Sequence, residues 1–176
     1  MKKTFCFVLT VLLFSACSLK YDENVSVNER IPEFIFKDAN LVRYENKERT
    51  VELFAEEIEK YENSANNYAK NVDFKAYNDK QELTTEGFCN YIYLNLDSEL
   101  YELYGNITLY AKDQNTYFYA DILRWNAKNE QLTSGRSDFV KIRKDDTVIY
   151  GSGFSASGVS RTYSFTGAVT GDIETK

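Results

Sequence analysis

Ile107-Thr108-Leu109-Tyr110-Ala111 decides the fold class, because aliphatic side chains alternate along it with hydroxyl-bearing ones. A period of two places successive side chains on opposite faces of a β-strand. The same period returns in residues 72–76, 140–143, 163–165 and 169–173, and polar, turn-like clusters separate the segments. Many short strands at this spacing predict an all-β sandwich, barrel or roll. Fourteen tyrosines and twelve phenylalanines also suit strands.

Residues 50–61 fit two kinds of element. Val51, Phe54, Ile58 and Tyr61 have helical spacing, with glutamates around them. The alternation from Val51 to Ala55 is instead typical of a strand. The residues alone leave both possibilities open.

Several glycines are expected to shape the backbone. Residues 104–107 and 166–169 form a loose internal repeat, in which a small residue precedes a strand. The stretch Gly151-Ser152-Gly153-Phe154-Ser155-Ala156 matches a dinucleotide-binding pattern, but the serine- and glycine-rich residues 155–162 follow where that pattern needs a helix. We therefore expect Gly151 and Gly153 to provide a positive φ or a close approach of strands.

Eight apolar residues are expected to point into one shared interior, because charged or polar residues alternate with them. They are Val72, Phe74, Ile107, Leu109, Val140, Ile142, Phe154 and Phe165. This pattern fits the packed core of a closed sandwich and the lining of an open slot equally well.

The N-terminus has the order of an export signal. Lys2 and Lys3 precede an apolar run over residues 5–14, and Ser15-Ala16-Cys17 follows in the manner of a bacterial lipobox. The run is short for a membrane-spanning helix, which needs ~20 apolar residues; an uncleaved anchor helix is the alternative. We expect a signal peptide at residues 1–16, a lipidated Cys17 and tether over residues 17–32, and one domain over residues 33–176.

Charge and composition exclude several classes of function. A net charge of −6 argues against nucleic acid, whose phosphates need a basic surface. The chain has no histidine, so it lacks the usual catalytic triads and histidine metal sites. We therefore expect no enzyme activity, metal or cofactor. Cys89 is expected to be a small core residue rather than a nucleophile.

The order of the segments resembles the LptC family, periplasmic components of the lipopolysaccharide export machine. The segments are residues 39–44, 51–61, 71–74, 103–109, 120–125, 139–142, 149–156 and 165–169. The resemblance implies an all-β, twisted and incompletely closed jellyroll of antiparallel strands, and it favours a strand at residues 50–61. Its apolar slot, lined by the eight residues named above, would receive acyl chains.

The resemblance also implies partners. The domain would accept lipopolysaccharide or a related glycolipid from an inner-membrane ABC transporter and pass it to a periplasmic jellyroll protein by joining strand edges. A lipidated Cys17 would replace the family's usual transmembrane helix and hold the protein at the inner membrane. We expect the docking edge in a C-terminal strand from Tyr163 to Ile173, through Tyr163, Phe165, Val169 and Ile173. The alternative is a surface lipoprotein whose closed sandwich binds a protein or glycan.

Overall fold

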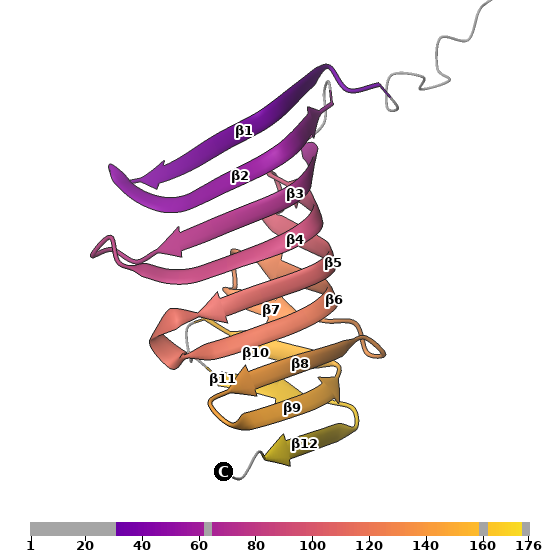
Figure 1. The fold of residues 1–176 in the computed structure, drawn as a ribbon. Helices are drawn as coiled ribbons and strands as arrows, with labels where there is room; N and C mark the ends of the chain where they lie inside the picture. The colour runs from indigo at the N-terminus through magenta and orange to yellow at the C-terminus, as the bar shows by residue number, and fades with distance from the viewer. Residues whose placement is uncertain (1–30, 62–64, 159–161, 174–176) are drawn as a thin grey trace, which may run out of the picture. The chain divides into compact units, whose positions relative to one another are not determined.

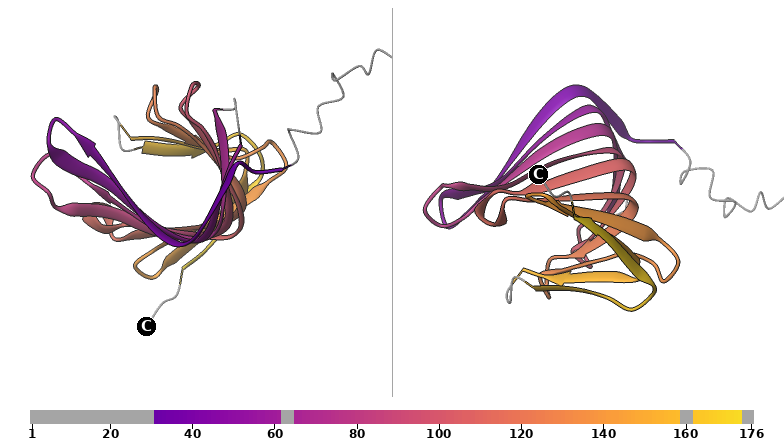
Figure 2. Two further views of the ribbon diagram at one scale, coloured as in Figure 1. Left: turned by 90° about the horizontal axis from the view of Figure 1, so that it is seen from above. Right: turned by 60° about the horizontal axis from the view of Figure 1, so that its bottom comes forward.

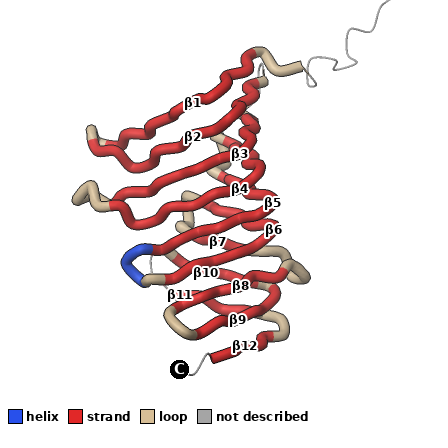
Figure 3. Tube along the Cα trace, viewed as in Figure 1, coloured by secondary structure: helices blue, strands red, loops and turns tan. Residues whose placement is uncertain are grey.

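Antiparallel strands make up nearly all of the computed structural model, which describes residues 31–61, 65–158 and 162–173 (Figures 1 and 3). These residues belong to one compact unit, Ile31–Lys176. The strands are β1 (Phe34–Glu45), β2 (Glu48–Lys60), β3 (Asn66–Tyr77), β4 (Leu83–Asn95), β5 (Leu100–Ala111), β6 (Thr116–Asn126), β7 (Gln131–Thr133), β8 (Phe139–Lys144), β9 (Thr147–Ser152), β10 (Phe154–Ser157), β11 (Thr162–Phe165) and β12 (Val169–Ile173). A 3-10 turn at Lys112–Gln114 lies between β5 and β6.

The sheet has two wings: a bend divides each long strand between them, and after β6 separate strands continue each wing. Strands β1 to β6 pair in chain order. Residues 116–120 of β6 then pair with β8, whereas residues 124–126 pair with β7. The first wing continues through β8, β9 and β12, and the second through β7, β10 and β11. Seen from above, the long strands curve so that the two wings face each other (Figure 2). The expected incompletely closed, antiparallel jellyroll is confirmed.

Each long strand bends at one position along its length. A polar residue at this position is not paired with the neighbouring strand. In β1 and β2, Lys37 pairs with Glu57 and Ala39 with Ala55, so that Asp38 and Glu56 are left out between them. Asp38 has a φ of 48°, a left-handed conformation that aspartate and asparagine tolerate better than most residues. The same level passes through Asn71, Asn90, Gly105, Asn106 and Asp121 in the strands that follow. This line of residues is where the sheet folds over.

The bend explains the helical spacing in residues 50–61. These residues lie in β2 and form a strand, as the family resemblance predicted. Ala55 and Ile58 are both buried although they lie three residues apart, because the unpaired Glu56 shifts the alternation by one. Ala69 and Val72 repeat this step in β3. A strand with such a bend imitates one turn of a helix in its apolar spacing.

The expectation of one strand from Tyr163 to Ile173 is wrong. Residues 162–165 form β11 in the second wing, and residues 169–173 form β12 in the first. The bend lies between them, where the amides of Thr166 and Gly167 donate to the carbonyls of Gly153 and Ser152. β9 and β10 are divided in the same way at Gly153, whose φ is +63°. Both small-residue segments of the internal repeat therefore fall at the bend.

The core lies between the wings, and both contribute to it. The first wing supplies Ala55, Val72, Cys89, Ile107, Leu109, Phe118, Val140 and Ile142; the second supplies Ile58, Ala69, Ile92, Leu103, Leu123 and Phe154. Cys89 is fully buried, and this burial raises the pKa of its thiol to about 12. It is therefore an inert core residue at neutral pH, as predicted.

The expected signal peptide and the lipidated Cys17 lie outside the described residues. Within the described ranges, no helix combines the length and the apolar character needed to cross a membrane.

Candidate functional site

Aromatic rings close the interior at its C-terminal end. Phe118 projects from the first wing and Phe154 from the second, with ring centres 5.7 Å apart. Tyr163 and Phe165 complete the cluster, and Phe165 lies 5.6 Å from Phe154. Because the rings span both wings, this end of the interior is filled with side chains.

Gly151 lets one of these rings rest on the sheet. An added Cβ would lie 2.5 Å from the Phe165 ring, so no larger residue fits without displacing it. At Gly153 an added Cβ would lie 2.2 Å from Thr166 Oγ1, and the positive φ adds strain. Both glycines thus contribute to the close approach of wings and rings.

At the β1 end the same apolar face is uncovered. Phe36 pairs with the buried Ile58, and Leu41 pairs with Leu53, so both side chains point to the inner face. Phe36 and Leu41 are nevertheless 50% exposed, and Phe34, two residues before Phe36, is 48% exposed. Burial therefore falls along the interior, from the aromatic cluster toward β1. A sandwich closed along its whole length would not leave these side chains open.

The eight residues expected to line a slot all lie in one cluster. Six are buried, and Phe74 and Phe165 are partly buried against them. They occupy the filled part of the interior, between the middle of the sheet and the aromatic cluster. The open part is lined instead by Phe34, Phe36 and Leu41, which the sequence analysis missed. The signal was present in Phe34-Ile35-Phe36, an apolar run on both faces of a strand.

Comparison with protein families agrees with this architecture. The model of the LptC family, described as lipopolysaccharide-assembly, LptC-related, matches residues 4–174. The chain belongs to the LptC family. A search of curated proteins found no match. This is a family of periplasmic lipid-transport proteins associated with the inner membrane, not a family of enzymes, and its members work with lipopolysaccharide and the machinery that transports it.

Three described strands of this LptC-family chain lie at edges of the sheet. β1 pairs with β2, β11 with β10, and β12 with β9, each along one side. β1 is the longest of the three, and eleven of its twelve residues are exposed. An edge of this kind presents N–H and C=O groups that another chain can pair with. Of the residues expected at a docking edge, Tyr163 and Phe165 lie in β11, whereas Val169 and Ile173 lie in β12.

Proposed function

We propose that this protein accepts lipopolysaccharide or a related glycolipid from an inner-membrane ABC transporter and holds its acyl chains on the apolar inner face. One observation carries the proposal: the inner face is closed by aromatic rings at the C-terminal end and open at β1, where Phe34, Phe36 and Leu41 are half exposed. Acyl chains laid there would cover these side chains. Each buried CH₂ contributes about 0.8 kcal/mol, so the site lowers the cost of moving lipid through water.

Photo-crosslinking in living cells tests this site. A benzophenone amino acid at Phe36 or Leu41 should capture lipopolysaccharide. The matched controls are Phe54 and Val42, exposed residues of β2 and β1 whose register places them on the opposite face. Equal capture from both faces would contradict the inner-face assignment.

We further propose that the protein passes the lipid to a periplasmic jellyroll partner that docks on its C-terminal edge. β12 is five residues long, and its exposed stretch from Val169 to Asp172 contains no proline or lysine, residues that often block edge pairing. Crosslinkers at Thr170 and Asp172 should capture the partner, and removal of residues 167–176 should abolish capture. If the truncated protein folds and still reaches the partner through another edge, the assignment fails.

The attachment to the membrane is proposed to be a lipid on Cys17, after removal of residues 1–16. Cys17→Ser should abolish acylation and release the protein from the membrane fraction. Mass spectrometry of the mature N-terminus gives the direct readout, and an unmodified N-terminus in the wild type would exclude the lipid anchor.

A further inference from the structure

A hollow of about 610 Å³ lies on the reverse face of the second wing. Tyr68 and Tyr93 line it, and so do their neighbours Ala69 and Ile92, although Ala69 and Ile92 are buried and belong to the core cluster on the inner face. Since successive residues of a strand point to opposite faces, the hollow lies on the other side of the sheet from the core. Its volume is within the range of small-molecule sites, ~300–1,000 Å³.

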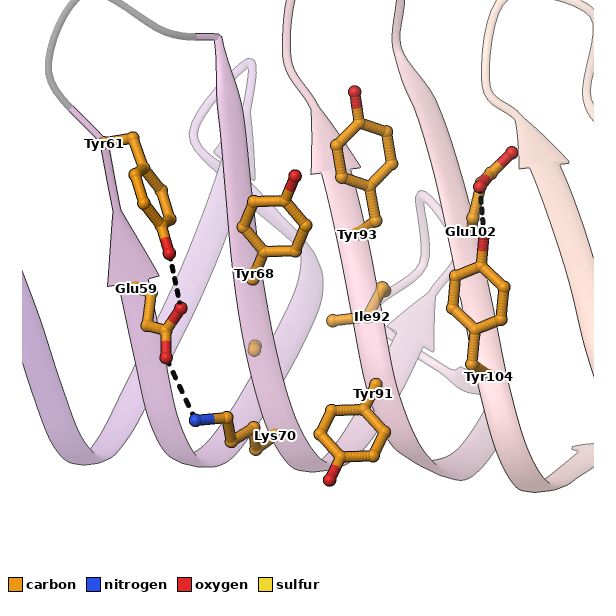
Figure 4. Close-up of a pocket in the computed structure, with 10 residues that line it drawn as sticks. Glu59, Tyr61, Tyr68, Lys70, Tyr91, Ile92, Tyr93, Glu102 and Tyr104 are labelled. Atoms are coloured by element: carbon orange, nitrogen blue, oxygen red, sulfur yellow. Dashed lines mark hydrogen bonds and ion pairs between the residues drawn. The ribbon is translucent and has the colours of Figure 1, made fainter. Parts of the chain in front are cut away.

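Tyrosines and glutamates line the hollow in two adjacent rows (Figure 4). The first row crosses four neighbouring strands in register and consists of Glu59, Tyr68, Tyr93 and Glu102. The second row lies one step nearer the bend and consists of Lys70, Tyr91 and Tyr104. In the first row the rings of Tyr68 and Tyr93 lie 5.3 Å apart. The result is an aromatic floor with a carboxylate at each end.

Both carboxylates are fixed in place and charged. Glu59 accepts hydrogen bonds from Tyr61 Oη at 2.8 Å and Lys70 Nζ at 3.0 Å. Glu102 accepts hydrogen bonds from Tyr104 Oη and, at 2.8 Å, from Arg124 Nε. The bond from Lys70 lowers the pKa of Glu59, and the bond from Tyr104 lowers the pKa of Glu102. A carboxylate has about four acceptor positions, so each retains capacity for a further donor.

One tyrosine of each row is open to solvent. Tyr68 is 42% exposed and Tyr91 is 54% exposed. An exposed ring face offers a flat apolar surface beside polar groups. A pyranose matches this combination, because one face of its ring carries C–H bonds while its hydroxyls project from the edge as donors. Glu57 also pairs with Lys70, at 2.5 Å. Three carboxylates (Glu57, Glu59 and Glu102) therefore stand against two cations within hydrogen-bond distance (Lys70 and Arg124). The excess of negative charge disfavours an anionic ligand, and the charged groups beside the rings disfavour a bare acyl chain.

We propose that this hollow binds a neutral saccharide, with a sugar ring stacked on Tyr68 or Tyr91 and its hydroxyls donating to Glu59 and Glu102. The site is separate from the acyl-chain face and does not depend on it. Its ligand could be a free glycan or the saccharide part of a glycolipid.

Saturation-transfer NMR with neutral glycosides tests the proposal. The full chain is purified in a detergent without a sugar headgroup and titrated with methyl glucoside, methyl galactoside, methyl mannoside and maltose. At least one probe should receive saturation from aromatic protons. At least one of Tyr68→Leu and Tyr91→Leu should weaken its binding at least fivefold, according to which ring the sugar stacks on, and the corresponding variant, Tyr68→Phe or Tyr91→Phe, should retain binding.

Tyr150→Leu is the matched control, because Tyr150 is 37% exposed on β9, outside the hollow, and its loss should leave binding unchanged. Circular dichroism checks that each variant is folded. The proposal is overturned if no neutral probe binds, if the tyrosine variants bind as the wild type does, or if glucuronate binds more tightly than methyl glucoside.

A photo-crosslinker at Tyr91 in cells separates the two sources of saccharide. Capture of lipopolysaccharide would identify the sugar of a glycolipid, and glycoside binding without such capture would identify a free glycan. Both results support a saccharide site. Since the NMR probes carry no acyl chain, their failure would leave the proposed lipid site standing.

Discussion

Phe154 is the largest of the fully buried side chains in the described residues, with 1% of its surface exposed. It contacts the rings of Phe118, Tyr163 and Phe165, and so joins the two wings at the closed end of the interior. A residue in this position holds the wings together, and under the proposed function it would limit how far acyl chains extend into the interior.

Phe154→Ala should therefore destabilise the fold by about 3–5 kcal/mol, through lost burial and the cavity left behind. Urea unfolding monitored by circular dichroism measures the change. The matched control is Phe139→Ala, because Phe139 is 68% exposed on β8, and its replacement should cost less than about 0.5 kcal/mol. Equal losses in the two variants would show that the aromatic cluster does not join the wings.

At the scale of the strands, the bend is the feature that makes the fold a jellyroll. Without it, strands that pair in chain order would form one open antiparallel sheet; with it, the two wings face each other. Asn71 lies at the bend of β3 with a φ of 48°, and its side-chain amide donates to Glu56 Oε2 at 2.5 Å on the neighbouring strand. The bend residues of adjacent strands thus support one another. Polar residues suit this level because they lie on the outside of the fold, where most of them are exposed.

Asn71→Val should lower stability by about 1–2 kcal/mol, since a branched side chain is strained in the left-handed region. Asn71→Gly should be tolerated better, because glycine adopts a positive φ without that strain. Asp73→Val serves as the control: Asp73 is exposed two residues along the same strand, where valine suits extended backbone. Thermal unfolding compares the three variants, and a harmless Asn71→Val would show that the bend needs no left-handed residue.

For the domain as a whole, the main property is the gradient of burial from the aromatic cluster to β1. Strands β5 and β6 carry five buried apolar side chains and pair on both sides, whereas β1 is exposed at eleven of its twelve residues. Regions with few buried contacts open with a lower free energy than the core. The end where we propose that lipid binds is thus also the end with the weakest packing.

Amide hydrogen exchange of the full chain should follow this gradient. Of the six long strands, β1 should exchange fastest and β5 and β6 slowest. Adding lipopolysaccharide should protect β1 while leaving the edge strand β12 unchanged, because the aromatic cluster separates β12 from the open face. Protection that is uniform along the sheet, or that is confined to β12, would contradict lipid binding at the β1 end.

Much of the fold and part of the candidate site could be predicted from the amino-acid sequence. Alternation in Ile107-Thr108-Leu109 and Val140-Lys141-Ile142 is a local property of the strand, so it identifies the β-class and the inward-facing residues without knowledge of the partners. The order of the segments was sufficient to indicate the LptC family. The eight inward residues share one cluster for the same local reason, although their contact with lipid stays a prediction.

Only the tertiary structure decided how these strands are bent, paired and covered. The bend divides residues 163–173 between two wings, and it depends on the positive φ of Gly153 and on the hydrogen bond from the Thr166 amide to the Gly153 carbonyl, which alternation does not report. Whether an inward residue is covered depends on the opposite wing, so Phe36 is half exposed while Phe154 is buried, although both are apolar residues on the inner face. The tyrosine hollow likewise assembles side chains from four strands across 46 positions of the chain, from Glu59 to Tyr104. Such features arise from pairing between distant segments, and for that reason a sequence read locally does not reveal them.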